Sequence, residues 1–258
     1  TVTVGLAPTT SGVLGLPLMQ AMRTRYPDVR LHMVESMSGH LTAMLNARQL
    51  DLAVLFDTRL HQTRQDGGGR GWSVMPLLEE DLFLVQRAGA PRLPDEIAIA
   101  DLAEVPLILP TGPHGLRSTL DTAFAGAGIS PRVVLEVDSL AMVMAAVDAG
   151  LGATLQPWAA LGRYPDAAQR FQCARITGAP ARRVKLKAPR ETTQEAWAWD
   201  DALTLEFHGA TLSAVEIVPA QVPTVWCCQA GPSTWRPHLV WSPASKSLTW
   251  RPVARPTN

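Results

Sequence analysis

TVTVGLAPTTSGVLGLPLMQAMRTRY, residues 1–26, decides the fold, because it reads as a strand, a polar elbow and a helix. Val2 and Val4 alternate with small and polar residues, which is the period-two pattern typical of a strand. Apolar residues then recur at helical spacing from Leu18 to Tyr26. Pro17 is expected in the first turn of this helix, where backbone N–H groups have no intrahelical partner. The stretch therefore predicts one β–α unit.

The elbow between the strand and the helix is rich in hydroxyl groups, which Thr9, Thr10 and Ser11 supply. A helix that begins at the end of a strand can bind an anion, because free N–H groups, the helix dipole and short donor side chains converge there. The alternative is that Thr10 or Ser11 only caps the helix, since Ser and Thr are common N-caps. The elbow alone leaves both interpretations open.

The chain repeats this β–α unit after Pro27. Residues 29–34 alternate as a second strand, and a second polar elbow leads into a short helix with Ser38 as its expected cap. Residues 50–56, LDLAVLF, form a nearly continuous apolar run, which suits a parallel strand covered on both faces. Strands and helices in alternation predict a parallel sheet with right-handed crossovers.

A second lobe is expected from about residue 80, and its elbows again carry small polar residues. Asp138 and Ser139 are expected to cap a helix, and Gly150 suits the left-handed position after that helix. The predicted fold class is α/β, with two Rossmann-like lobes and a cleft between them. The strands expected in and just before this lobe cover residues 74–78, 82–86, 105–109, 133–137 and 152–155.

Composition excludes several classes of protein. The 258 residues carry a formal net charge of zero, which does not indicate a nucleic-acid surface. No apolar stretch is long enough for a membrane span, and three cysteines give neither a metal spacing nor a disulfide framework. We therefore expect a cytoplasmic protein without metal or cofactor. Because the chain begins with Thr1 inside an expected strand and no signal peptide precedes it, we expect a fragment or a processed product.

The last third of the chain differs from the rest. The net charge is −3 over residues 1–180 and +3 over residues 181–258, and all three lysines and six of the eight tryptophans lie in the second part. A glycine-rich loop at 66–71, DGGGRG, lacks the Gly-Lys-Ser/Thr of a phosphate-binding loop and is expected to be only a flexible connection.

Several long stretches resemble the effector-binding domain of LysR-type transcriptional regulators, and they follow the order of that family. The short motifs PHGLR and LGATLQPWAAL are most similar to its nitrogen assimilation control group. The resemblance covers about residues 1–180, and no family pattern is recognised from Val184 onward. The stretches are LPLMQAMRTRYPDVRLHMVESMSGHLTAMLNARQLDLAVLFD, EEDLFLVQ, ADLAEVPLILP and the run from PHGLR to PWAAL.

The resemblance implies two α/β lobes like those of type 2 periplasmic binding proteins, with a small effector held in the cleft. It places the first lobe at residues 1–79, the second at 80–178, and a hinge return followed by an atypical tail at 179–258. Since the tail lacks the family pattern, we expect it to be a frame-shifted or read-through translation that leaves the first lobe incomplete. Sequencing the DNA across codons 178–190 tests this hypothesis.

The resemblance also implies an effector-binding site, whose hydroxyls would donate short hydrogen bonds and whose Arg117 would pair with a carboxylate or another oxyanion. The effector is therefore expected to be a small anion. The expected contacts from the first lobe are Thr9, Thr10, Ser11, Ser36, Met37 and Ser38, and those from the second lobe are Thr111, Gly112, His114, Arg117, Asp138, Ser139, Gln156 and Pro157.

Each expected contact has a purely structural alternative. Arg117 would be a solvated residue in a first helical turn, and His114 a loop histidine bonded to backbone. Asp138 would be only an N-cap, and Met37 a packing residue.

The resemblance names the partners as well. It implies a homodimer or tetramer through the regulatory domain, and operator DNA bound only by an N-terminal helix-turn-helix that this chain lacks. No motif of a hydrolase or a metalloenzyme is present, so no catalytic activity is expected. The alternative function is a periplasmic solute-binding protein for a small anion, because that class has a similar two-lobed shape.

Overall fold

The computed structural model describes residues 1–56, 72–112 and 115–189, together with the backbone of four later strands at 204–207, 210–213, 235–242 and 247–254. The chain divides into two compact units. Unit 1 comprises Thr1–Leu77 and Val184–Pro223, and unit 2 comprises Leu78–Arg183 and Thr224–Asn258.

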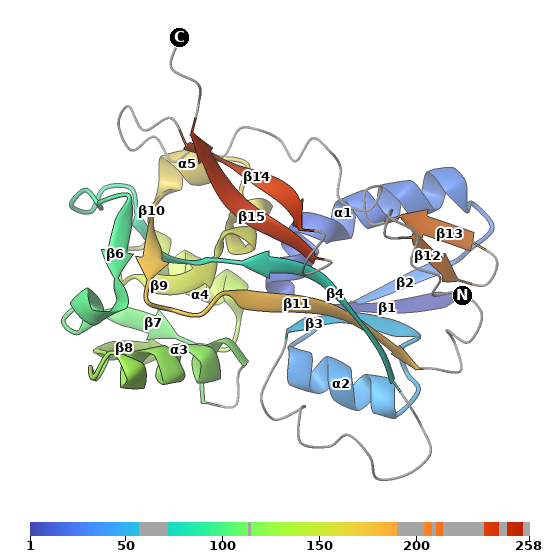
Figure 1. Cartoon of the computed structure of the whole chain (residues 1–258), viewed down its shortest axis with the longest axis horizontal. Helices are drawn as coiled ribbons and strands as arrows, with labels where there is room; N and C mark the ends of the chain where they lie inside the picture. The colour runs from blue at the N-terminus through green and yellow to red at the C-terminus, as the bar shows by residue number, and fades with distance from the viewer. Residues whose placement is uncertain are drawn as a thin grey trace. The chain divides into compact units, whose positions relative to one another are not determined.

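Unit 1 is built on a parallel arrangement of its first three strands. β1 pairs in parallel with β2 on one side and with β3 on the other, which confirms the predicted parallel sheet. Figure 1 shows α1 and α2 on opposite sides of these strands, so both faces of β1 are covered. The elements are β1 (Val2–Leu6), α1 (Pro8–Arg25), β2 (Leu31–Glu35), α2 (Ser38–Asn46) and β3 (Leu52–Phe56).

Helix α1 begins earlier than the sequence predicts. Pro8 occupies the first turn and Ala7 is the N-cap, so Pro17 lies in the helix interior and the prediction for it is wrong. A proline at the start of a helix has a suitable φ angle and loses no hydrogen bond, so Pro8 and Pro17 are both compatible with a helix start. Burial of Leu14 and Leu18 on either side of Pro17 stabilises the continuous helix.

Helix α2 is likewise capped differently from the expectation. Its N-cap is Met37, which makes no side-chain cap hydrogen bond, and Ser38 is already the first helical residue. The Ser38 hydroxyl instead accepts a hydrogen bond from the Phe56 backbone N–H at 3.3 Å. Ser38 therefore joins α2 to β3 rather than capping the helix.

A later strand returns to unit 1. β11 (Arg182–Pro189) pairs antiparallel with β3, with Val184 opposite Phe56. Val184 and Leu186 are buried. No family pattern was recognised from Val184 onward, but the strand continues there and pairs with β3. The strand also lies beside β4 (Trp72–Glu80) in a seven-stranded sheet of order β14-β15-β4-β11-β3-β1-β2, where β14 is Trp235–Ser242 and β15 is Ser247–Ala254.

Unit 2 contains a mixed sheet, so it does not repeat the parallel arrangement of unit 1. Its order is β6-β10-β5-β9, in which β5 is antiparallel to both neighbours and β10 is parallel to β6. β7 and β8 form a separate parallel pair. The elements are β5 (Leu82–Arg87), β6 (Glu96–Ala98), η2 (Ile99–Leu102), β7 (Leu107–Leu109), α3 (Gly115–Gly126), β8 (Val133–Glu136), α4 (Leu140–Asp148), β9 (Thr154–Pro157), η3 (Trp158–Arg163), α5 (Ala167–Arg170) and β10 (Phe171–Thr177).

Two details of unit 2 confirm the sequence prediction. Ser139 is the N-cap of α4, and its hydroxyl accepts from the Met142 backbone N–H at 3.4 Å. Gly150 has a φ of 77° and follows α4 in the left-handed conformation. Asp138 is not the cap of this helix, because the cap position belongs to its neighbour.

Three strand predictions need correction. β4 runs through the acidic pair Glu79 and Glu80, so only Asp81 separates it from β5. β9 includes Gln156 and Pro157, which were expected after the strand. β10 was not predicted; Phe171, Ala174 and Ile176 are buried on this strand, and the residues between them are half-buried.

The remaining segments add little to the site. The glycine-rich loop at 66–71 lies outside the described residues. β12 (Thr204–Phe207) pairs with β13 (Ala210–Ser213), and β14 (Trp235–Ser242) pairs with β15 (Ser247–Ala254). The side chains of the predicted aberrant tail beyond residue 200 are outside the described part of the chain. Among the helices described, none combines the length and apolar character that crossing a bilayer requires.

Candidate functional site

The first turn of α1 buries two hydroxyl groups without hydrogen-bond partners. Thr9 and Thr10 are each 5% exposed, and no atom in the described part of the chain bonds to their Oγ1 atoms. A buried hydroxyl without a partner costs about 1–3 kcal/mol. The dipole at the amino end of a helix favours an acceptor or an anion, so this end of α1 is chemically suited to one.

Ser11 makes a different contact from its neighbours. Its hydroxyl donates to the Pro8 carbonyl at 3.1 Å and makes a short contact to the Glu35 carboxylate at the end of β2. The predicted donor Ser11 therefore already has an acceptor in the protein. Glu35 also brings a negative charge to this end of the sheet, which opposes an anion beside Ser11.

The second elbow of unit 1 connects its polar residues to each other. The Ser36 hydroxyl and Nδ1 of His40 are 3.0 Å apart, and the Ser36 backbone N–H donates to the Leu6 carbonyl at 3.2 Å. Met37 is half-buried at the N-cap of α2. Because the Ser36 N–H bonds to the end of β1, the two elbows of unit 1 lie side by side, as the carboxyl ends of parallel strands require.

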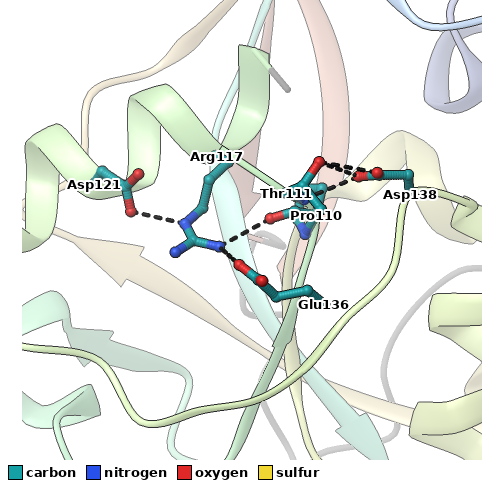
Figure 2. Close-up of polar contacts among 6 residues, drawn as sticks. All are labelled: Pro110, Thr111, Arg117, Asp121, Glu136 and Asp138. Carbon is teal, nitrogen blue, oxygen red and sulfur yellow. Dashed lines mark hydrogen bonds and ion pairs between the residues drawn. The ribbon is translucent and has the colours of Figure 1, made fainter. Parts of the chain in front are cut away.

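In unit 2, Arg117 is surrounded by acceptors of the protein itself. Its Nε donates to Asp121 at 2.8 Å, and its Nη1 donates to Glu136 at 2.7 Å and to the Pro110 carbonyl at 2.9 Å (Figure 2). These contacts, first the hydrogen bond to Asp121, raise the pKa of Arg117 above its ordinary value, against the opposing effect of burial. Two carboxylates already balance the guanidinium, so Arg117 braces α3 against β8 and is a poor anion receptor.

The neighbouring elbow holds a second bonded pair. Asp138 accepts from the Thr111 backbone N–H and from the Thr111 hydroxyl, each at 2.9 Å (Figure 2). These bonds connect the end of β7 to the segment before α4. Thr111, Arg117, Asp138 and Ser139 are therefore brought together with Asp121 and Glu136, and the group carries more negative than positive charge.

The remaining predicted contacts of unit 2 differ in their exposure. Gly112 is exposed, and a Cβ at this position would meet no atom within 4 Å. Gln156 and Pro157 are buried on β9, and Gln156 donates to the Thr154 hydroxyl at 3.4 Å. His114 lies outside the described residues.

Sequence reasoning missed Glu35, Asp121 and Glu136. Asp121 was detectable, because it is four residues after Arg117 on the same helix and such pairs face each other. Glu35 and Glu136 each end a strand, where side chains of parallel sheets gather, but nothing in their spacing reveals which hydroxyl or guanidinium they meet. No cluster of three or more metal-binding side chains occurs in the described part of the chain.

Comparison with known proteins places the chain in a family. The family model of the "LysR substrate binding domain" matches residues 1–199. The nitrogen assimilation regulatory protein nac of Klebsiella aerogenes is 31% identical over 182 residues, which cover 70% of this chain and 54% of that protein. The chain thus spans about half the length of the curated relatives it matches.

Solved structures share the fold. A C206 mutant of OxyR from Corynebacterium glutamicum superposes with a TM-score of 0.61 at 24% identity, covering 75% of this chain and 59% of that chain. The CcmR regulatory domain of Synechocystis PCC6803, solved in complex with 2-PG, gives 0.60 at 16% identity, covering 83% and 91%. At these identities the likeness shows the fold alone, and together with the family match it supports the predicted α/β fold of the type 2 periplasmic-binding-protein class.

Proposed function

The chain belongs to the family of LysR substrate-binding domains, and from this membership we propose that it senses a small effector for a bacterial transcriptional regulator. The similar proteins of known role are regulators, and this supports a regulator over an enzyme and over the periplasmic alternative. The proposed place of action is the cytoplasm, where such a regulator meets its DNA.

The observation that carries the proposal is the pair of buried, unpartnered hydroxyls on α1. Thr9 and Thr10 lie where a helix amino end favours an acceptor, and the described protein atoms leave both hydroxyls unsatisfied. We propose that effector binding satisfies them. The other predicted contacts of the two units, from Ser36–Ser38 to Asp138 and Ser139, are proposed as further parts of the effector-binding surface.

The charges refine the proposed effector. We propose a small molecule with a carboxylate or similar oxyanion, bound at the first turn of α1 rather than at Arg117. The helix dipole and two hydroxyl donors favour the anion there. Arg117 would not pair with it, because Asp121 and Glu136 already occupy the guanidinium.

Thermal melting of residues 1–258 with a panel of small carboxylates and sulfur oxyanions, each beside its neutral amide or ester, tests the proposal. A ligand that binds only the folded state raises the melting temperature. The expected result is a rise for one oxyanion that its neutral analogue does not give and that Thr9→Val or Thr10→Val removes. Thr42→Val is the matched control, since its hydroxyl already bonds to the Ser38 carbonyl. A rise that survives both α1 substitutions would refute the site.

The oligomer and the operator DNA are proposals about the whole regulator. We propose that operator binding belongs to the part of the regulator that this chain does not span. A second copy of the domain is proposed to dock on the α1–β2 groove, which is defined by Met19, Met22, Arg23, Tyr26, Pro27, Val29, Leu31 and Met33. This groove lies beside β2, which ends the seven-stranded sheet and so leaves one edge unpaired within the described strands.

A further inference from the structure

Two oppositely charged side chains are buried in unit 2. Glu80, the last residue of β4, is 3% exposed, and Arg182, the first residue of β11, is 6% exposed. β4 and β11 are neighbours in the sheet. Charged residues are almost never buried to this extent unless they are paired, so this arrangement requires an explanation.

The alternation of β11 shows why Arg182 is buried with Glu80. Arg182 lies on the same inward face as Val184, Leu186 and Ala188, all of which are buried. Arg183 on the opposite face is exposed. Arg182, and not Arg183, is therefore the arginine of β11 that lies on the inward face with Glu80.

The other charged groups around the end of β4 are engaged elsewhere. Asp81 follows Glu80 and lies 3.6 Å from Arg175 of β10, and Arg175 also donates to Glu96 of β6. Within the described part of the chain, Arg182 is the charged group that acts on Glu80. Oε2 of Glu80 has no hydrogen-bond partner among the described atoms, so the carboxylate is incompletely satisfied.

Burial governs the ionisation of both groups. It raises the pKa of Glu80 to about 7, although the positive charge of Arg182 opposes the shift. It lowers the pKa of Arg182 to about 10, which Glu80 opposes. Near neutral pH the Glu80 carboxyl therefore changes between its protonated and its ionised form, while the Arg182 guanidinium stays charged.

The pair also occupies a special place in the chain. The chain passes from unit 1 to unit 2 within β4, between Leu77 and Leu78, and returns within β11, between Arg183 and Val184. Glu80 and Arg182 lie two or three residues inside unit 2 at these two crossings. Any change in the pairing of β4 and β11 there acts on both connecting strands at once.

We propose that Glu80 and Arg182 form a proton-responsive latch at the adjoining ends of β4 and β11, closed when the Glu80 carboxyl holds its proton and loosened when it loses it. The sign follows from linkage, because the closed state binds the proton more strongly than an open state in which water solvates Glu80. Closure is complete below the ordinary carboxyl pKa and weakens as pH rises toward about 7. The proton would then be a second ligand of the sensing domain.

Hydrogen exchange of the intact chain tests the latch. The exchange rates of the backbone amides at the end of β4 and the start of β11 are measured from pH 5.5 to 8.5. Each rate is divided by the intrinsic exchange rate at the same pH. Local opening of the natural chain is expected to increase about tenfold or more across this range, a factor that corresponds to one pKa unit between the closed and open states. Glu80→Gln mimics the protonated carboxyl and should remove the pH dependence, whereas Glu104→Gln, at an exposed carboxylate of the same unit, should keep it. A natural chain without pH dependence, or a Glu80→Gln chain that retains it, would overturn the proposal.

A second measurement covers the case in which Glu80→Gln does not fold. The carboxyl carbon of Glu80 is titrated by NMR in the unaltered chain, with side-chain carbons labelled. A midpoint near 7 supports the latch. A midpoint near that of exposed glutamates refutes it.

Discussion

Arg117 donates from Nη1 to Oε1 of Glu136 over 2.7 Å, and this ion pair connects the first turn of α3 to the end of β8. Arg117 is mostly buried while Glu136 is half exposed, so water screens the pair in part. The guanidinium also holds Asp121 and the Pro110 carbonyl. A single side chain thus fixes three segments of unit 2.

Arg117→Ala is expected to lower the free energy of unfolding by about 1–2 kcal/mol, because it removes charge-assisted hydrogen bonds and leaves Asp121 and Glu136 unpaired beside each other. Arg117→Lys should recover only part of the loss, since an ammonium cannot reproduce the fork of the guanidinium. Urea denaturation measures both variants. Equal stability of Arg117→Ala and the natural chain would show that the contacts contribute nothing net.

Removal of either buried α1 hydroxyl is expected to leave the protein at least as stable. Thr9→Val and Thr10→Val keep the side-chain shape and eliminate an unpaired hydroxyl, so each should change the free energy of unfolding by between zero and about +1 kcal/mol. Thr42→Val removes a 2.8 Å hydrogen bond and should lose about 1 kcal/mol. A clear loss at both Thr9 and Thr10, measured without ligand, would mean that these hydroxyls already have acceptors.

The start of α1 could be predicted only in part from the sequence. The strand and the helix were predictable from residues 1–26, but the hydroxyls that were assigned to an elbow before the helix lie in the first turn of α1. Either Pro8 or Pro17 could begin a helix by local preference, and only the burial of Leu14 and Thr10 in the folded unit selects Pro8. Tertiary packing, which no local pattern contains, decided the boundary.

The charged partners of the candidate site residues were also not predictable from the sequence. The family resemblance implied Arg117 as a site residue, but its partner Glu136 lies nineteen residues away and meets it because β7 and β8 pair in parallel. The return strand β11 was not predicted from its residues, although Val184–Lys187 alternates apolar residues with lysines. The structure shows that this alternation is the burial pattern of a strand with one inward face.

A side chain at position 152 is expected to clash with its neighbours. A Cβ there would lie 2.8 Å from the Pro106 carbonyl oxygen and 3.1 Å from Cγ1 of Ile108. Because the nearest atom is backbone and cannot move aside cheaply, Gly152→Ala should lower the free energy of unfolding by about 1–3 kcal/mol.

Gly126 provides the control for this substitution. It ends α3, and a Cβ there would meet nothing within 4 Å, so Gly126→Ala should be neutral or stabilising by up to about 1 kcal/mol. Chemical denaturation compares the two variants. The steric explanation fails if both alanines have the same effect.

The α1–β2 groove makes a prediction about self-association. Met19 lines the groove and is 43% exposed, so Met19→Glu should add a charge to the proposed contact and weaken association at least tenfold. Met142→Glu is the control, because Met142 on α4 is 63% exposed and outside the groove. Analytical ultracentrifugation over a range of protein concentrations measures the self-association of each variant. A natural chain that stays monomeric, or equal weakening by both substitutions, would contradict the proposed surface.

Two truncations separate the return strand from the atypical tail. A chain ending at residue 183 loses Val184, Leu186 and Ala188, each of which is buried, and exposes the edge of β3, so it should not melt cooperatively. A chain ending at residue 199 keeps β11 and the whole family match. It loses β15, which pairs with β4 only at Leu78 and Glu79.

The chain ending at residue 199 is therefore expected to melt cooperatively within a few degrees of the full chain. That result would support the proposal that the tail is a frame-shifted or read-through translation, and would place the change after β11 rather than within codons 178–190. Loss of cooperative melting in this chain alone would refute it, because the tail would then supply core that the family-like part needs. DNA sequencing from codon 190 onward supplies the independent check, since the proposal requires a family-like alternative frame there.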